Sequence, residues 1–173
     1  MRFRTSPGAY ERDVAFREFA RQRAAPLHRS AYLLCGDWHL AEDLVQEVLA
    51  KVYVHWRRVQ DADNPDAYVR RILVNEARQR WRRKDAPVAR VDTVTDQAAP
   101  DWSDDLVRRT ELFEALLRLP AGQRATIVLR HLDGLSERET AVALGCSEGT
   151  VKSQASRAMA ALRKYFETQE ATA

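Results

Sequence analysis

The sequence predicts an all-α protein made of two small helical domains joined by an extended acidic linker. Apolar residues recur at spacings of three and four along most of the 173 residues, and no stretch alternates as a strand would. Between residues 85 and 105 this period stops, and two prolines stand among six aspartates and a single arginine. Such a composition is typical of a linker. We therefore expect one domain over residues 12–84 and a second over residues 106–168.

The first domain is expected to contain helices on both sides of a short turn. Residues 12–35 predict one or two helices, because Pro26 either starts a helix or interrupts one. Residues 40–56 predict a helix with an apolar side that runs from Leu40 to Trp56. The stretch "DADNP" at residues 61–65 predicts a turn that caps a further helix over residues 66–84.

The second domain is expected to end in a helix-turn-helix. Helices are predicted from about residue 105 to 119 and from 123 to 132. Ser136 and Glu139 then form a capping-box pattern, Gly145 is placed to end that helix, and Ser147 is placed to cap the last one.

The last predicted helix has an apolar face and a face of small polar and basic residues. Val151, Ala155, Ala158 and Leu162 share the apolar face. The other side presents Gly149, Ser153 and Ser156, flanked by Lys152 and Arg157. A second helix of this kind can enter a DNA major groove. From spacing alone, a plain helical hairpin with a solvated basic face remains the alternative.

A second basic surface is predicted on the helix over residues 66–84. Seven basic residues stand against two acidic ones in this segment, a net charge of +5. One side of the helix carries Arg71, Asn75, Arg78 and Arg82, with Tyr68 and Gln79 at its margin. This set of side chains suits single-stranded or melted DNA. The cations can bind phosphates, the aromatic ring can stack on an unpaired base, and the amide can hydrogen-bond to a base edge. A merely solvated arginine face is the alternative, and Trp81 is expected in the core.

A third polar cluster lies on the helix over residues 40–56. Asp43, Gln46 and Glu47 follow an i, i+3, i+4 spacing on its polar side. This arrangement suits a protein partner, although ordinary surface solvation would give the same spacing.

Other functional classes find little support in the sequence. The four histidines and two cysteines show no metal-ligand spacing, and we expect neither a metal nor a cofactor. No apolar run approaches the roughly 20 residues of a membrane span, and the first residues lack the apolar core of a signal peptide. We expect a cytoplasmic protein whose cysteines are free, buried thiols.

Four segments, in order, resemble the extracytoplasmic-function class of bacterial RNA polymerase sigma factors. They are "AEDLVQEVLAKVY" at residues 41–53, "PDAYVRRILVNEARQRWRRK" at 65–84, "LPAGQRATIVLRHLDGLSERETAVALG" at 119–145 and "CSEGTVKSQASRAMAALRKYF" at 146–166. The resemblance covers about residues 19–166. It implies a non-enzymatic factor that binds core RNA polymerase and promoter DNA and that directs transcription initiation. An anti-sigma factor is a further candidate partner.

The resemblance also implies roles for individual residues. Asp43, Gln46 and Glu47 would contact the clamp helices of the largest polymerase subunit. Tyr68, Arg71, Asn75 and Arg78 would melt and read the −10 element, with Asn75 on a base. Thr150, Lys152, Ser153, Ser156 and Arg157 would engage the −35 element, with Thr150 near a phosphate. The acidic linker would run over the core enzyme.

Two rival functions were weighed against this one. "GCSEGTVKSQ" also resembles the helix-turn-helix of response-regulator effectors, which suggests a stand-alone dimeric transcription regulator. That function leaves the surfaces around Asn75 and Gln46 without a role, and the chain has no receiver domain. An enzyme acting on nucleic acid would require paired carboxylates, a phosphate loop or a nucleophile elbow, and the sequence has none of them.

Overall fold

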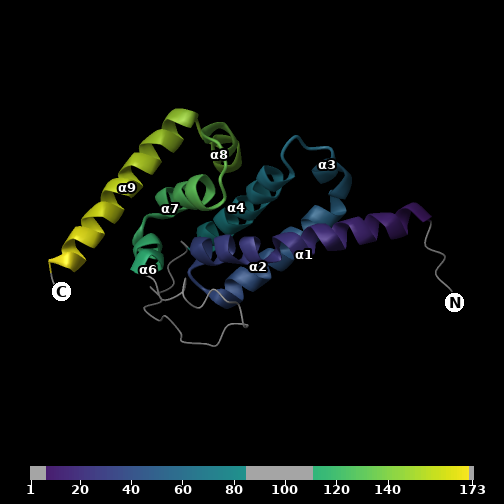
Figure 1. The fold of residues 1–173 in the computed structure, drawn as a ribbon, viewed down its shortest axis with the longest axis horizontal. Coiled ribbons are helices and arrows are strands. Elements are labelled where there is room, and N and C mark those ends of the chain that lie inside the picture. Colours follow the sequence, from purple (N-terminus) through teal and green to yellow (C-terminus); the bar gives the residue numbers. More distant parts are fainter. Residues whose placement is uncertain (1–6, 85–110, 172–173) are drawn as a thin grey trace.

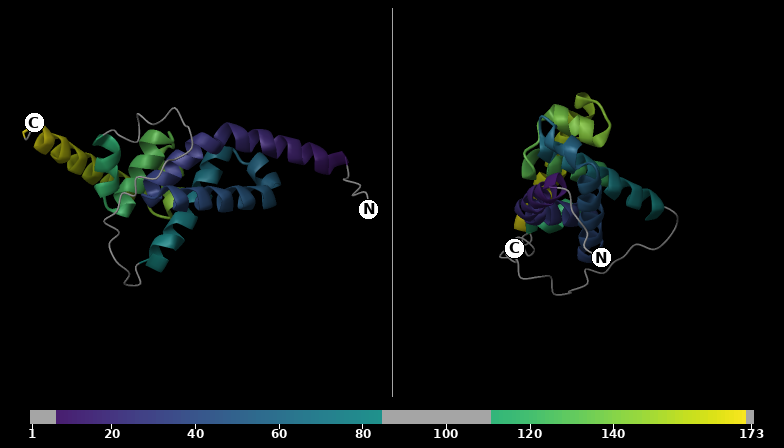
Figure 2. Two further views of the ribbon diagram at one scale, coloured as in Figure 1. Left: turned by 90° about the horizontal axis from the view of Figure 1, so that it is seen from below. Right: turned by 90° about the vertical axis from the view of Figure 1, so that its right-hand side faces the viewer.

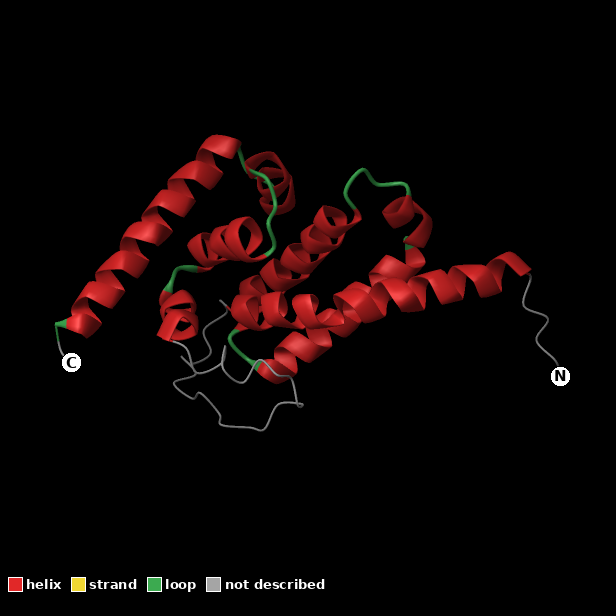
Figure 3. Ribbon diagram, in the orientation of Figure 1, coloured by secondary structure: helices red, strands yellow, loops and turns green. Residues whose placement is uncertain are grey.

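The computed structural model describes residues 7–84 and 111–171, and within these ranges the chain forms helices and no strand (Figure 3). The predicted fold class is confirmed. The predicted linker at residues 85–105 lies outside the described residues. We call residues 7–84 the N-terminal half and residues 111–171 the C-terminal half. No helix in these two halves is long and apolar enough to cross a membrane.

The N-terminal half is built on one long helix, α1 (Pro7–Cys35), which continues through Pro26. Proline has no N–H to donate to the preceding turn, so packing on both sides of Pro26 must hold the helix together. Gly36 ends α1 with a positive φ of 73°. Asp37 then caps α2 (Trp38–Val54) by accepting a hydrogen bond from the N–H of Leu40 at 2.9 Å.

The helix predicted over residues 40–56 divides in two at His55. A short α3 (Trp56–Gln60) follows α2, and Trp56 and Val59 turn inward from it. The predicted turn leads into α4 (Pro65–Lys84), where the Asn64 side chain accepts from the N–H of Ala67 at 3.0 Å. The side chains of residues 81–84, including those of Trp81 and Arg82, lie outside the described part.

The C-terminal half follows the predicted order with one irregular turn. It comprises α6 (Glu111–Arg118), α7 (Ala121–Ile127), a π-helical turn η1 (Val128–Leu132), α8 (Glu137–Leu144) and α9 (Glu148–Glu170). The segment predicted as one helix over residues 123–132 therefore begins earlier and ends in a wider turn. In that turn the N–H of Asp133 donates to the carbonyl of Val128 at 2.9 Å.

The two halves pack against each other, and α1 contributes to both parts of the core. The first apolar cluster joins Leu27, Leu44 and Leu73 of the N-terminal half to Ala125 and Leu129 of the C-terminal half. The second surrounds Leu33 of α1 with residues from α6, α7 and α9. Figure 1 shows α8 beside the beginning of α4, and the two helices are in contact, while α7 contacts α1. In Figures 1 and 2 the N-terminal end of α1 and the C-terminal end of α9 point to opposite ends of the molecule.

Candidate nucleic-acid interface

The helix-turn-helix forms as its capping residues predict. Ser136 Oγ accepts from the N–H of Glu139 at 3.1 Å, and a Glu139 carboxylate oxygen accepts from the N–H of Ser136 at 2.8 Å. Gly145 ends α8 in the left-handed region with a φ of 61°. Ser147 caps α9 by accepting from the N–H of Thr150 at 3.1 Å. The capping box, the glycine turn and the second cap are all confirmed.

Helix α9 presents the polar face that the sequence predicts. Val151, Ala158 and Leu162 are buried, and Ala155 is half-buried. The residues predicted to engage DNA are all exposed: Thr150, Lys152, Ser153, Ser156 and Arg157. An exposed row of small hydroxyl residues flanked by cations permits close approach to a duplex.

Three of these α9 residues already have partners within the protein. The Thr150 hydroxyl shares a hydrogen bond of 2.9 Å with the Ser147 hydroxyl. Ser153 Oγ donates to the carbonyl of Thr150 at 3.0 Å, so its oxygen lone pairs remain to accept a hydrogen bond from a base. The Lys152 ammonium lies 3.4 Å from a carboxylate oxygen of Glu137 in α8. This exposed ion pair holds Lys152 against α8, the first helix of the motif. Because an exposed ion pair contributes little free energy, Lys152 can leave Glu137 and bind a phosphate instead.

The face of α4 that was predicted to bind melted DNA is only partly open. Arg71 and Asn75 are exposed, while Tyr68 is half-buried and packs against the first apolar cluster. Arg78 donates to the backbone carbonyl of Leu144, at the end of α8. Arg82, the fourth residue of this face, falls among the residues whose side chains are not described.

The residues predicted to bind polymerase form an exposed strip on α2. Asp43, Gln46 and Glu47 are exposed, and Leu44 and Val48 on the other side of the helix are buried. Arg80 of α4 donates to a carboxylate oxygen of Glu47 at 2.8 Å. The ion pair therefore fixes the Glu47 side chain against α4, whereas Asp43 and Gln46 have no such contact with another helix in the described part of the chain.

A buried ionic cluster that the sequence analysis missed joins the two halves. Arg70 of α4 lies 2.9 Å from Asp133, which follows η1, and Ser30 of α1 donates to the same carboxylate oxygen at 2.8 Å. Burial raises the pKa of the Asp133 carboxyl above its ordinary value, and the opposing effects of Arg70 and Ser30 are smaller. Arg70 and Asp133 are 63 residues apart, so no local pattern predicts the pair.

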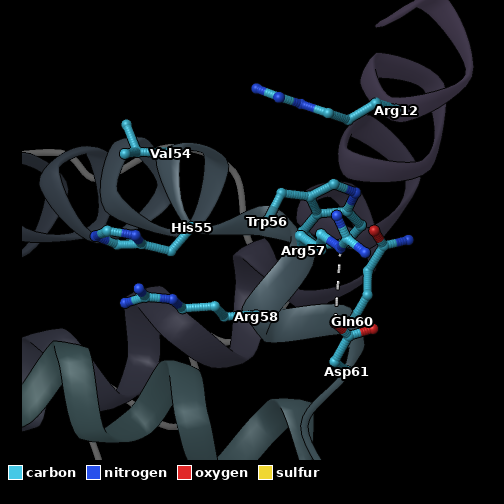
Figure 4. A pocket seen from close by; sticks show the side chains of 8 residues that line it. All are labelled: Arg12, Val54, His55, Trp56, Arg57, Arg58, Gln60 and Asp61. Carbon is cyan, nitrogen blue, oxygen red and sulfur yellow. Dashed lines mark ion pairs between the residues drawn. The ribbon is translucent and has the colours of Figure 1, made fainter. Parts of the chain in front are cut away.

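A cationic cleft at the corner between α2 and α3 was also missed. Its volume is about 920 Å³, and its lining residues are Arg12, Val54, His55, Trp56, Arg57, Arg58, Gln60 and Asp61. Figure 4 shows Arg12 reaching over from α1, and an ion pair of 4.0 Å between Arg57 and Asp61. A run of basic residues at 57–58 was the only signal of this surface in the sequence.

The described surfaces of α2, α4 and α9 carry carboxylates, cations, amides and hydroxyls, which are groups that bind polar partners. Within residues 7–84 and 111–171, no three potential ligands gather as they would at a metal site. Neither Cys35 nor Cys146 is in a disulfide in the described part of the chain, and each is half-buried rather than buried as expected.

Comparisons with known proteins agree with this arrangement. Residues 19–86 match the family model described as sigma-70 region 2, and residues 109–162 match the model described as sigma-70, region 4. The RNA polymerase sigma-E factor of Streptomyces avermitilis is 36% identical over 157 residues, which cover 91% of this chain and 88% of that protein. The ECF RNA polymerase sigma factor SigL of Mycobacterium tuberculosis is 32% identical over 165 residues, which cover 92% of this chain and 93% of that protein.

Solved structures resemble the chain over both halves. The sigma factor RpoE of Bartonella quintana, solved in complex with the anti-sigma factor NepR, matches with a TM-score of 0.70 and 29% identity over 87% of this chain and 97% of that one. CnrH, solved with the cytosolic domain of CnrY, shares the fold with a TM-score of 0.61. With two family models matched in order and relatives that align along nearly their whole length, the chain belongs to the sigma-70 family of RNA polymerase sigma factors, in its extracytoplasmic-function group.

Proposed function

We propose that this sigma factor binds core RNA polymerase through α2 and directs transcription initiation by reading the −10 element with α4 and the −35 element with α9. The observation that carries the proposal is the exposed polar face of α9, presented by a correctly capped helix-turn-helix in a chain with a second cationic helix. The factor acts by binding and not by catalysis, and it works in the cytoplasm beside the polymerase. Its domains are the proposed units 12–84 and 106–168, joined by the linker 85–105.

The polymerase would be bound by Asp43, Gln46 and Glu47. Their exposure on the side of α2 opposite its buried residues supports this role, as does the fixed position of the Glu47 carboxylate beside Arg80. A strip held on a rigid helix loses little conformational entropy when a partner binds.

The promoter would be read by two surfaces with different chemistry. On α4, Asn75 would contact an unpaired base, Arg71 and Arg78 would track phosphates, and Tyr68 would stack only after moving from its half-buried position. On α9, Ser153 and Ser156 would face base edges, and Thr150, Lys152 and Arg157 would meet phosphates. An anti-sigma factor is a further expected partner, because the solved RpoE relative is bound to one.

The polymerase assignment is tested with the pair of changes Gln46→Ala and Glu47→Lys. We expect the doubly changed chain to lose co-elution with core polymerase and promoter-dependent transcription, with unchanged helicity by circular dichroism. The matched control is Gln169→Ala with Glu167→Lys, the same exchange at exposed positions near the end of α9. Arg80→Ala releases the Glu47 carboxylate but keeps the α2 residues, so it should weaken polymerase affinity less than the double change does.

Unchanged polymerase affinity in the Gln46/Glu47 variant would overturn the assignment of this surface. A wild-type chain that fails to bind core polymerase and instead elutes as a dimer on promoter DNA would favour the stand-alone regulator.

A further inference from the structure

One carboxylate lies between two cations at the start of the helix-turn-helix. Glu137 is the first residue of α8, and α8 lies beside the beginning of α9 (Figure 1). One of its carboxylate oxygens lies 3.4 Å from the ammonium of Lys152 in α9. The other lies 3.9 Å from the guanidinium of Arg130 in η1. A single negative charge therefore connects three successive elements of the C-terminal half.

The two cations differ in how firmly the protein holds them. Arg130 also donates to the carbonyl of Leu135 at 2.5 Å, and its side chain is 27% exposed. The side chain of Lys152 is 64% exposed, and it belongs to the face of α9 that is proposed to meet DNA. Of the two cations, Lys152 is therefore the one that can move from Glu137 to a phosphate.

Glu137 is not required for the cap of α8. The cap uses the other acid of the first turn, Glu139, which accepts hydrogen bonds from the N–H of Ser136 and the amide of Asn64. The carboxylate of Glu137 makes its ion pairs to cations of η1 and α9 instead. The fold of the motif therefore does not explain why an acid stands at this position.

A phosphate can bind Lys152 only in competition with Glu137. When Lys152 turns to the DNA, the carboxylate loses an ion pair and stays on the first turn of α8, near the bound strand. The like charges of the carboxylate and the phosphates then oppose binding. An exposed ion pair contributes little free energy, so this competition weakens the contact of Lys152 with a phosphate and does not prevent it.

The competition has a measurable signature in the salt dependence of binding. The affinity of a protein for DNA falls with salt according to the number of phosphates that its cations neutralise. A carboxylate beside one of these cations cancels about one positive charge. The chain with Glu137 should therefore show a shallower salt dependence than the same chain without this acid.

We propose that Glu137 is a positioning residue that restrains the −35 domain by holding Lys152 away from the DNA backbone. It lowers the affinity of α9 for any duplex and does not select among sequences. The inference rests on the proposed function, which assigns a phosphate to Lys152. It adds a residue that the sequence analysis did not single out, and this residue acts in the opposite direction to the proposed DNA contacts of α9.

The first experiment measures DNA binding by holoenzyme assembled from core polymerase and the full chain. The probes are a fluorescent promoter fragment that the wild-type holoenzyme transcribes and the same fragment with a scrambled −35 element, each at several salt concentrations. Glu137→Gln should bind both fragments about threefold more tightly, the size expected when a competitor as weak as an exposed ion pair is removed. The salt slope should become steeper by roughly 1.

Two further variants separate this effect from net charge and from folding. Glu167→Gln makes the same charge change at an exposed position near the end of α9 and should leave affinity and salt slope unchanged. Glu137→Asp keeps the negative charge and should keep the shallow slope of the wild type. A purely structural role for Glu137 would lower Tm and weaken binding in Glu137→Gln, and that result would overturn the proposal.

The second experiment asks whether Glu137 acts through Lys152. Glu137→Gln is made in the wild type and in a Lys152→Ala background, and the gain in affinity is compared as a double-mutant cycle. The gain should be larger where Lys152 is present, because only there does the carboxylate occupy a cation that the DNA needs. Equal gains in the two backgrounds would show a general repulsion of DNA and would refute the role through Lys152.

The remaining outcomes distinguish this inference from the proposed function. A Glu137→Gln variant that changes the preference between the two fragments would show that Glu137 contacts a base, which contradicts the proposal. Wild-type holoenzyme that binds both fragments equally would instead refute the −35 role of α9. In that case the salt slopes of the wild type and Glu137→Gln on either fragment would still test the competition with phosphates.

Discussion

The carboxylate of Glu139 offers a sharp test of how the helix-turn-helix is stabilised. One of its oxygens accepts from the N–H of Ser136, and the other accepts from the amide of Asn64. The change Glu139→Gln leaves one carbonyl oxygen, so only one of these two hydrogen bonds can persist. It also removes a negative charge from the first turn of α8.

The expected loss follows from these two effects. A hydrogen bond of this kind contributes about 0.5–1.5 kcal/mol, and a charge beside a helix N-terminus contributes about 0.3–1 kcal/mol. The free energy of unfolding should therefore fall by about 1–2 kcal/mol at pH 7. For a chain of this length that lowers Tm by roughly 2–8 °C.

The difference should depend on pH in one direction. The hydrogen bond from the Ser136 backbone, followed by those from the side chains of Ser136 and Asn64, lowers the pKa of Glu139 below its ordinary value. A carboxyl whose pKa is lowered on folding stabilises the protein above its unfolded pKa, about 4.3, and this stabilisation disappears as the pH falls through the folded value. The gap in Tm between wild type and Glu139→Gln should therefore narrow as the pH is lowered from 7 to about 3.

Thermal unfolding followed by circular dichroism at a series of pH values makes the measurement. Glu148→Gln is the matched control, because Glu148 is an exposed acid in the first turn of α9. A gap for Glu139→Gln that stays constant with pH would refute the reasoning, and so would a control that reproduces its pH dependence.

Four further predictions concern DNA binding and the core. Asn75→Ala should reduce open-complex formation, seen as weaker permanganate reactivity of the bubble, with little change in initial promoter association; an unchanged bubble would assign the amide a structural role. Arg157→Ala should weaken transcription from all −35 variants about equally and lower the salt slope by roughly 1. Ser153→Ala should instead shift the preference at one base pair by about 1–3 kcal/mol. Transcription of a library of −35 sequences at several salt concentrations separates the two effects. If the Arg157 and Ser153 variants lower activity alike and neither changes the sequence preference, α9 does not recognise bases. Leu129→Ala should lower the free energy of unfolding by about 2–5 kcal/mol. Both halves should still unfold in one thermal transition, at a lower Tm. Two separate thermal transitions in the wild-type protein would contradict a shared core.

The features that the sequence predicted well depend on residues close together in the chain. The capping box of Ser136 and Glu139, the left-handed Gly145 and the buried stripe of α9 each need only a turn or two of helix to form. The residues in each feature are near neighbours in the sequence, so their types alone are enough to predict it. The same backbone geometry recurs wherever such a pattern occurs.

The features that the sequence missed depend on where distant segments meet. Arg70 looked like any other arginine on a basic helix, yet it is buried against Asp133 from the other half of the chain. Arg78 was correctly placed on the polar side of α4, but its bond to Leu144 follows from the packing of the halves. The π-helical turn at η1 was likewise hidden, because its apolar spacing is close to that of an α-helix. The roles of the site residues in polymerase and DNA binding remain predictions.

The way α1 serves both halves also has a consequence for synthesis of the protein on the ribosome. Leu33 is fully buried in the finished chain, and Phe113, one of the residues that cover it, is translated 80 residues later. At about 5–20 residues per second, the nascent chain waits roughly 4–16 s for that cover. During this interval the end of α1 presents an apolar stripe to solvent, and chaperones that bind apolar segments can bind there until the last helices emerge.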